Sequence, residues 1–163
     1  MSLRSQLEQF LGIKGGRRVA ILGIGSPIRG DDAVGVAVVE RLEARGLENV
    51  LLLKTETVPE SFTGLIRRFN PTHVLMIDAA HLGDKPGAAR IIPTQRITGE
   101  IISTHHLPLT ELSNFIRGTM DAKVALLGIQ PESIAVGTEM TPALREAANR
   151  IADEIYGFLV ENS

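Results

Sequence analysis

The chain has 163 residues, a net charge of −2 and no cysteine. This length predicts one domain that is large enough to bury a core without disulfides. A composition of 44% hydrophobic and 22% charged residues excludes a disordered protein. The lack of cysteine excludes a thiol nucleophile, an iron–sulfur cluster and a cysteine-ligated zinc site. We expect a single domain over residues 1–163, with residues 1–17 as a helical N-terminal extension.

Charge and hydropathy argue against two classes of partner. Seventeen basic residues against nineteen acidic ones leave no basic surplus, and one Tyr with five Phe supplies few rings for base stacking, so we expect no nucleic acid. No stretch approaches the roughly 18 consecutive apolar residues of a membrane span. Arg4, Gln6 and Glu8 stand where a signal peptide is apolar. We therefore expect a cytoplasmic protein without membrane insertion.

Apolar residues alternate between helical and strand-like patterns along the whole chain. In chain order, the pattern predicts a helix over 3–11, a strand over 19–23, a loop over 24–31, a helix from 34 to about 46 and a strand over 50–53. There follow a helix over 61–69 with Ser61 as N-cap, a strand over 73–77, a strand over 88–92, a helix over 109–117 that ends before Gly118, a strand over 123–129 and a final helix capped by Thr141.

Strands that alternate with helices predict the fold class. We expect a three-layer α/β/α domain with a mainly parallel, twisted sheet, of the kind found in phosphorylases and hydrolases. In such sheets, ligands bind beyond the carboxyl ends of the strands. The residues that follow Gly23, Ile77 and Ile129 are therefore the first candidates for a functional site.

The loop after the first predicted strand is rich in glycine and ends in two carboxylates, Asp31 and Asp32. It does not favour a dinucleotide site, because Ile28 stands where the fingerprint needs glycine. The carboxylates also take the place at the helix start that a pyrophosphate would occupy. Capping of the helix is the structural alternative for both aspartates. One aspartate suffices for the cap, which leaves the second to point along the sheet edge.

Three further positions complete a candidate site. Asp78 follows the predicted strand 73–77, and His105 and His106 lie just before a predicted helix. Two carboxylates and one imidazole form a mixed oxygen and nitrogen site that suits nickel or zinc and leaves positions open. A turn role for Asp78 and a packed or capping role for a histidine are the structural alternatives. His81 is a weaker candidate, as a partner of Asp78.

Two further candidates, His73 as a site residue and a serine as a nucleophile, are less favoured. His73 opens a predicted strand, which places it at the solvent rim. A serine nucleophile is not favoured either, because the chain has no Gly-x-Ser-x-Gly turn.

The loop from Gly23 to Gly35 resembles the opening of the hydrogenase maturation endopeptidases, which process the large subunit of nickel–iron hydrogenases. Further segments resemble that family in the family's order, and together they cover about Val19 to Phe158: 57–61, 70–79, 86–87, 103–109, 127–132 and 140–142. The segments at 103–109 and 127–132 are most similar to the branch that serves formate hydrogenlyase.

The resemblance implies an endopeptidase, metal-dependent or aspartic-type, that removes a C-terminal extension from the nickel-loaded large-subunit precursor. It implies that Asp32, Asp78 and His105, rather than His106, contact the metal and act in catalysis. Nickel would arrive with the substrate, and no organic cofactor is implied. Ser26 and Ala33 stand where the family often has Asn and Gly, and neither is an implied ligand.

Two alternatives to this protease stay open. A nickel carrier without proteolysis would use the same three side chains. Few histidines argue against it, because carriers often have histidine-rich tracts. Peptidyl-tRNA hydrolases open with a similar glycine loop, but they lack the Gly-Asp-Asp sequence and an acidic chain suits tRNA poorly.

Overall fold

The fold is taken from a computed structural model that describes residues 1–94, 102–103 and 105–163. The strands are β1 (Val19–Ile24), β2 (Val50–Glu56), β3 (His73–His81), β4 (Ala89–Pro93), β5 (Ile102–Ser103) and β6 (Lys123–Ile129). The α-helices are α1 (Leu3–Leu11), α2 (Val34–Arg45), α3 (Thr63–Phe69), α4 (His106–Met120) and α5 (Pro142–Glu161), and two 3-10 helices are η1 (Gly30–Ala33) and η2 (Pro59–Phe62).

The main path through the sheet has the order β2-β1-β3-β6-β4. The pairs β1/β2, β1/β3 and β3/β6 are parallel, while the edge strand β4 runs antiparallel to β6. Strand β5 pairs antiparallel with the last two residues of β3. Every residue of β1 is buried, as expected for a parallel strand with helices over both faces.

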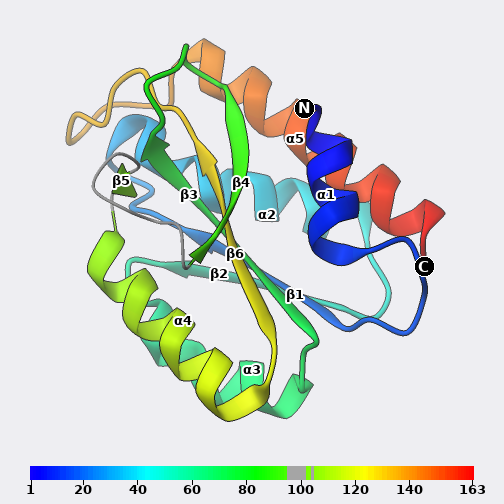
Figure 1. The fold of residues 1–163 in the computed structure, drawn as a ribbon. Coiled ribbons are helices and arrows are strands. Elements are labelled where there is room, and N and C mark those ends of the chain that lie inside the picture. The colour runs from blue at the N-terminus through cyan, green and yellow to red at the C-terminus, as the bar shows by residue number, and fades with distance from the viewer. Residues whose placement is uncertain (95–101, 104) are drawn as a thin grey trace.

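Helices cover the sheet on both sides (Figure 1). Helices α1, α2 and α5 pack on one face, where Leu7, Leu42 and Phe158 are among the fully buried side chains. Helices α3 and α4 pack on the other face through Ile66 and Ile116. The expected three-layer α/β/α fold is confirmed. No helix in the described ranges is long and apolar enough to cross a membrane.

Strand β3 is longer than the sequence predicts. The prediction ended it at Ile77, but Asp78 lies inside the strand, opposite Gly128 of β6. Beyond it, Ala80 and His81 pair with β5. The extension depends on partners that are distant in sequence, because the segment 78–81 carries no strand pattern of its own.

The predicted boundaries of two helices, α3 and α4, are also wrong. Ser61 is not the N-cap of α3, because it lies within η2 and Phe62 holds the cap position. Helix α4 begins earlier than predicted, at His106, and continues through Gly118 to Met120. Asp121 ends it in the left-handed conformation. A glycine inside a helix is destabilising by only about 1 kcal/mol, so Ile116 and its packed neighbours outweigh it.

Candidate functional site

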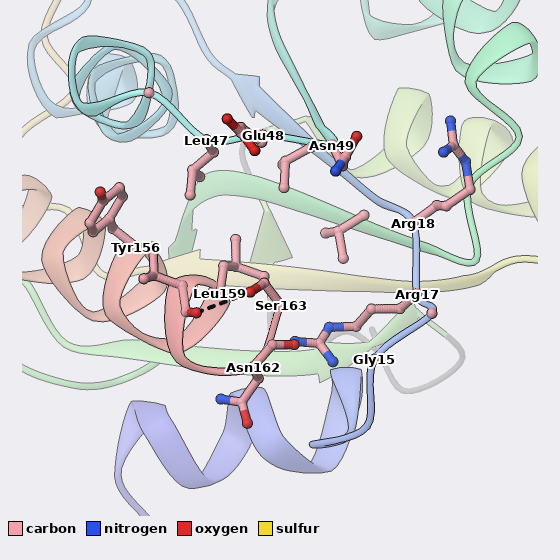
Figure 2. Close-up of a pocket in the computed structure, with 15 residues that line it drawn as sticks. Gly15, Arg17, Arg18, Leu47, Glu48, Asn49, Tyr156, Leu159, Asn162 and Ser163 are labelled. Carbon is pink, nitrogen blue, oxygen red and sulfur yellow. Dashed lines mark hydrogen bonds between the residues drawn. The ribbon is translucent and has the colours of Figure 1, made fainter.

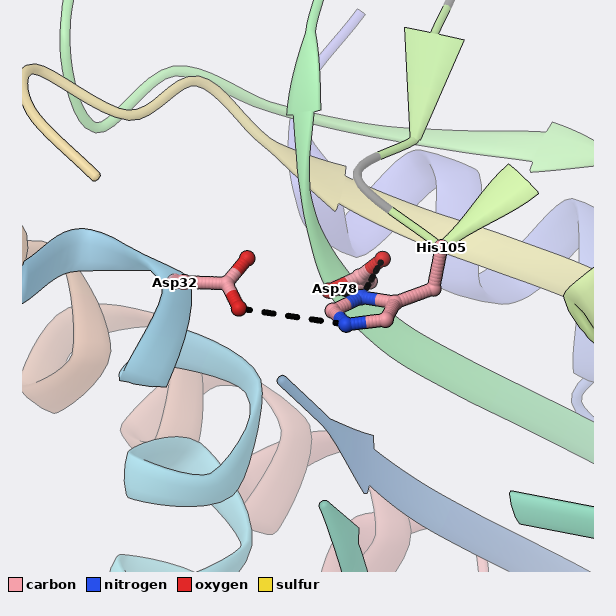
Figure 3. A group of neighbouring side chains, drawn as sticks. All are labelled: Asp32, Asp78 and His105. Carbon is pink, nitrogen blue, oxygen red and sulfur yellow. Dashed lines mark hydrogen bonds and ion pairs between the residues drawn. The ribbon is translucent and has the colours of Figure 1, made fainter. Parts of the chain in front are cut away.

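The candidate site lies where β1 and β3 approach their carboxyl ends. Asp32 is part of η1, which follows β1. Asp78 is in β3, and His105 is the residue before α4. Figure 3 shows the three side chains pointing toward one another from these separate elements. The structure thus brings together all three residues that the resemblance implied.

The imidazole of His105 lies between the two carboxylates. Its Nδ1 is 3.2 and 3.3 Å from the oxygens of Asp78, and its Nε2 is 3.9 Å from Oδ2 of Asp32. Both aspartates are fully buried, and the histidine side chain is 13% exposed. One ligand atom from each of the three residues lies within 4.8 Å of the others. This spacing lets the three atoms contact one cation between them.

The electrostatics of the cluster favour a positive charge at its centre. The hydrogen bond with Asp78 raises the pKa of His105, and the charges of Asp78 and Asp32 raise it further. Burial and the cation of Arg29 act in the opposite direction on that pKa. Two oxygen donors and one nitrogen donor also match the preference of a borderline divalent metal ion. The donor set therefore fits nickel or zinc, as the sequence predicted.

The backbone around Asp32 leaves no room for side chains at two glycines. Gly25 has a φ of +131°, and a Cβ atom there would lie 1.8 Å from the carbonyl oxygen of Asp32. A Cβ atom on Gly35 would lie 2.1 Å from the carbonyl oxygen of Ile77. These close approaches press the start of α2 against β3 and set Asp32 beside Asp78. The amide of Ser26 donates a 2.8 Å hydrogen bond to Oδ2 of Asp32.

Asp31 has a different role from the helix cap that the sequence suggested. It is fully buried, and no side chain caps η1 or α2. Instead, its carboxylate accepts hydrogen bonds from the amides of Glu132, Ser133 and Thr141, at 2.9, 3.0 and 2.7 Å. It also accepts from the hydroxyl of Thr141, which is why that hydroxyl does not cap α5. Asp31 joins the first loop to the loop that precedes α5.

His73 and His81 lie away from the cluster, and the side chain of His106 is outside the part of the chain that the structure describes. His81 is exposed, and it stands three residues after Asp78 in the same strand, so the two side chains leave opposite faces. The weaker hypothesis that it supports Asp78 is therefore wrong. His73 lies at the start of β3, with Nδ1 2.8 Å from the hydroxyl of Thr72. The side chain of His106 and the residue Thr104 fall outside the described part.

Sequence reasoning assigned no role to Arg29. Its Nε atom is buried and has no hydrogen-bond partner, the only such side-chain atom found among the described residues. Its charge lowers the pKa of His105. The sequence signal that could have pointed to Arg29 is the presence of a cation in the first loop, three residues before Asp32. It partly offsets the negative charge of the two buried carboxylates.

A separate hollow of about 600 Å³ lies at the amino ends of β1 and β2 (Figure 2). Two arginines line it, and their guanidinium groups are already bonded to backbone carbonyls. Arg17 donates to Lys14 and Asn162, both at 2.6 Å, and Arg18 donates to Phe69 at 2.9 Å. These bonds tie the chain ends to the domain. The hollow is at the opposite edge of the sheet from the cluster.

Comparison with known proteins identifies the family. A family model described as HycI, hydrogenase maturation protease, matches residues 36–157. The chain belongs to the hydrogenase maturation protease family. A Methanocaldococcus jannaschii protein described as a hydrogenase maturation protease is 35% identical over 157 residues, with 91% of this chain and 90% of that one covered. The hydrogenase 3 maturation protease of Escherichia coli strain K12 is 29% identical over 139 residues, with 85% and 88% covered.

A solved structure agrees with this assignment. The crystal structure of the NiFe hydrogenase maturation protease HycI from Thermococcus kodakarensis KOD1 superposes on this protease with a TM-score of 0.84 and 35% identity. The match covers 97% of this chain and 98% of that one. The family resemblance and the peptidase activity expected from the sequence are confirmed.

Proposed function

We propose that this protease removes a C-terminal extension from the nickel-loaded precursor of a nickel–iron hydrogenase large subunit. We further propose that Asp32, Asp78 and His105 contact the nickel of that substrate. The observation that carries the proposal is the convergence of two buried carboxylates and one imidazole, with ligand atoms within 4.8 Å. A relative named for the maturation of hydrogenase 3 supports the class of substrate.

The geometry supports a cluster that binds a metal already held by another protein. Three ligands leave positions of a divalent ion open for groups of the substrate. Asp78 fixes the imidazole plane through His105 Nδ1, so that Nε2 faces Asp32. The amide of Ser26 holds the Asp32 carboxylate in turn. The protease thereby presents a preset half of a coordination sphere, and the precursor would complete it.

Two hydrolytic routes use this cluster, and the need for nickel separates them. A metal ion bound there supplies Lewis acidity, which polarises a carbonyl or activates water. In the other route, a carboxylate takes the proton of the attacking water as a general base. The first route requires the nickel-loaded precursor. The second would cut a folded, nickel-free precursor as well.

The direct test is a cleavage assay read by mass spectrometry. The protease is mixed with the nickel-loaded precursor and, in parallel, with the nickel-free precursor. We expect loss of a C-terminal peptide from the loaded form alone. Asp32→Asn, Asp78→Asn and His105→Ala should each lower the rate by about a hundredfold to a thousandfold, the scale seen when a group that acts on the transition state is removed.

Matched controls are available in exposed residues of the same types. Asp84→Asn and His81→Ala should cleave at the wild-type rate, because both side chains lie outside the cluster. Full activity in all three cluster variants would exclude the proposed site. No cleavage of a precursor shown to be folded and loaded, together with nickel binding that depends on the cluster, would favour the carrier function instead. The boundary at residue 17, the cytoplasmic location and the lack of an organic cofactor stay predictions.

A further inference from the structure

Three segments at the carboxyl edge of the sheet are joined by hydrogen bonds beside the cluster. They are the first loop with η1 (25–33), the last residue of β2 with the segment after it (56–62) and the segment after β6 (130–141). The amide of Gly25 donates to the carbonyl of Glu56 at 2.9 Å, which joins the first two loops. The amide of Gly137 donates to the carbonyl of Ile28 at 2.8 Å, which joins the first and third. In Figure 1, the segment after β6 lies beside the start of α2.

Each of these loops carries one large apolar side chain that is exposed. Ile28 is 66% exposed, Val58 46% and Val136 72%. Apolar side chains that are exposed together, with polar residues around them, mark an interaction surface. The hydrogen bond between Gly137 and Ile28 places two of the three loops side by side. We call Ile28, Val58 and Val136 the apolar rim.

The same loops are strongly acidic. Their charged residues are one cation, Arg29, and six carboxylates: Asp31, Asp32, Glu56, Glu60, Glu132 and Glu139. The two aspartates are buried and already engaged, whereas the four glutamates are exposed. Loops lined by one sign of charge attract partners of the opposite sign. We call these four residues the acidic ring.

From this combination we propose that the apolar rim and the acidic ring bind one stretch of the precursor polypeptide, a stretch that carries apolar side chains and a surplus of lysine and arginine. The inference rests on the proposed function, since the precursor is the partner that must reach the cluster. Apolar contacts would supply affinity, and the glutamates would select charge and speed the encounter. Recognition would then use the chain of the substrate in addition to its nickel.

The test separates binding from cleavage. Binding of the nickel-loaded precursor is measured by fluorescence titration on protein that also carries Asp78→Asn, which prevents cutting. We expect the triple variant Ile28→Ser, Val58→Ser and Val136→Ser to weaken Kd at least tenfold. In proteins with an intact cluster, the same three changes should raise KM at least tenfold and leave the rate at saturating precursor within twofold.

The charge of the ring is tested by Glu132→Gln with Glu139→Gln. This pair should weaken binding about threefold and reduce the dependence of Kd on salt, because screening acts on exposed charges. The matched controls are Ile13→Ser with Val160→Ser, and Glu40→Gln with Glu48→Gln. All four control residues are exposed, and they lie outside the three loops.

The possible results are distinct. If the rim and ring variants bind the precursor as tightly as the controls while the wild type cuts it, the docking surface is wrong and the proposed function stands. If the wild type binds the precursor and the rim variants weaken that binding, but nothing is cut, the surface stands and the proteolysis proposal fails. If no form binds the precursor, the docking proposal is overturned. Circular dichroism of every variant confirms that it is folded.

Discussion

The two ends of the parallel sheet treat their charged side chains in opposite ways. At the amino end, Arg17 and Arg18 line a large hollow, yet their hydrogen bonds go to backbone carbonyls of the same chain. At the carboxyl end, ligand atoms of Asp32, Asp78 and His105 lie within 4.8 Å of one another. The charged groups at the amino end are therefore bonded to the backbone of the domain, whereas those at the carboxyl end are directed at one another.

One charged residue at the carboxyl end, Asp31, is also bonded to the backbone, as Arg17 and Arg18 are at the amino end. Asp31 is next to Asp32 in sequence and equally buried, but its oxygens are bonded to three amides and one hydroxyl. Of these two adjacent aspartates, Asp31 thus joins two loops of the same chain, whereas Asp32 faces His105. Substitutions of one charged residue at a time test this difference between residues bonded to the backbone and residues of the cluster.

The largest expected effect on stability is at Asp31. Asp31→Asn places an amide NH2 group against backbone donors that need an acceptor. Removing one partner of a buried, hydrogen-bonded charge lowers the stability of the fold by several kcal/mol. We expect the free energy of unfolding to fall by about 3 kcal/mol, measured by urea denaturation. Asp84→Asn, in an exposed loop where the carboxylate accepts from Lys85, is the control and should change it by less than about 0.5 kcal/mol. A midpoint unchanged at Asp31 would contradict its anchoring role.

An intermediate effect is expected at the amino end. Arg17→Met removes two hydrogen bonds to carbonyls and the contact of the guanidinium with the ring of Phe158. Each net hydrogen bond is worth about 1 kcal/mol, so the free energy of unfolding should fall by about 1–2 kcal/mol. Precursor cleavage at a temperature well below the midpoint should be unaffected. Arg90→Met, at an exposed position, is the matched control. A lost cleavage activity would show that the two ends are coupled.

The smallest effect separates two histidines at the two ends of the sheet. Burial lowers the pKa of His73 below its ordinary value of 6.5, and Lys123 and Arg17 lower it further. The hydrogen bond with Asp78 raises the pKa of His105 above 6.5. NMR titration of the imidazole rings, assigned with His73→Gln and His105→Gln, should give a lower midpoint for His73. A higher midpoint for His73 than for His105 would contradict the opposite effects that their surroundings have on the two pKa values.

These directions also fix the sign of each contribution to stability. The contribution of His73 is present above pH 6.5 and is lost as the pH falls through its lowered folded-state pKa. The contribution of His105 is present below pH 6.5 and is lost as the pH rises through its raised folded-state pKa. Urea denaturation across pH 5 to 9 on the two Gln variants and the wild type checks both signs.

Much of the fold could be predicted because it depends on local periodicity. Short apolar runs gave the parallel strands, and amphipathic spacing gave the helices on both faces. The convergence of the site could be anticipated too, because the carboxyl ends of parallel strands meet at one edge. The choice of His105 came from the family resemblance, and no spacing pattern pointed to it.

The features that could not be predicted depend on partners far away in the sequence. The role of Asp31 depends on amides 101 to 110 residues later. The extension of β3 through Asp78 depends on pairing with β6 and β5. The buried, unpartnered Nε of Arg29 depends on how the first loop folds. None of these leaves a mark in the local pattern of the chain.

The hydrogen bonds of Asp31 have a consequence for the order of events during synthesis. A ribosome releases the first loop long before residues 132–141 exist, so the first loop cannot be locked until the chain is nearly complete. The imidazole that Asp78 orients also arrives later, at residue 105. A growing chain therefore holds Asp32 and Asp78 before the imidazole that completes the cluster has been synthesised. Under the proposed function, proteolytic competence is confined to molecules whose C-terminal third is already in place.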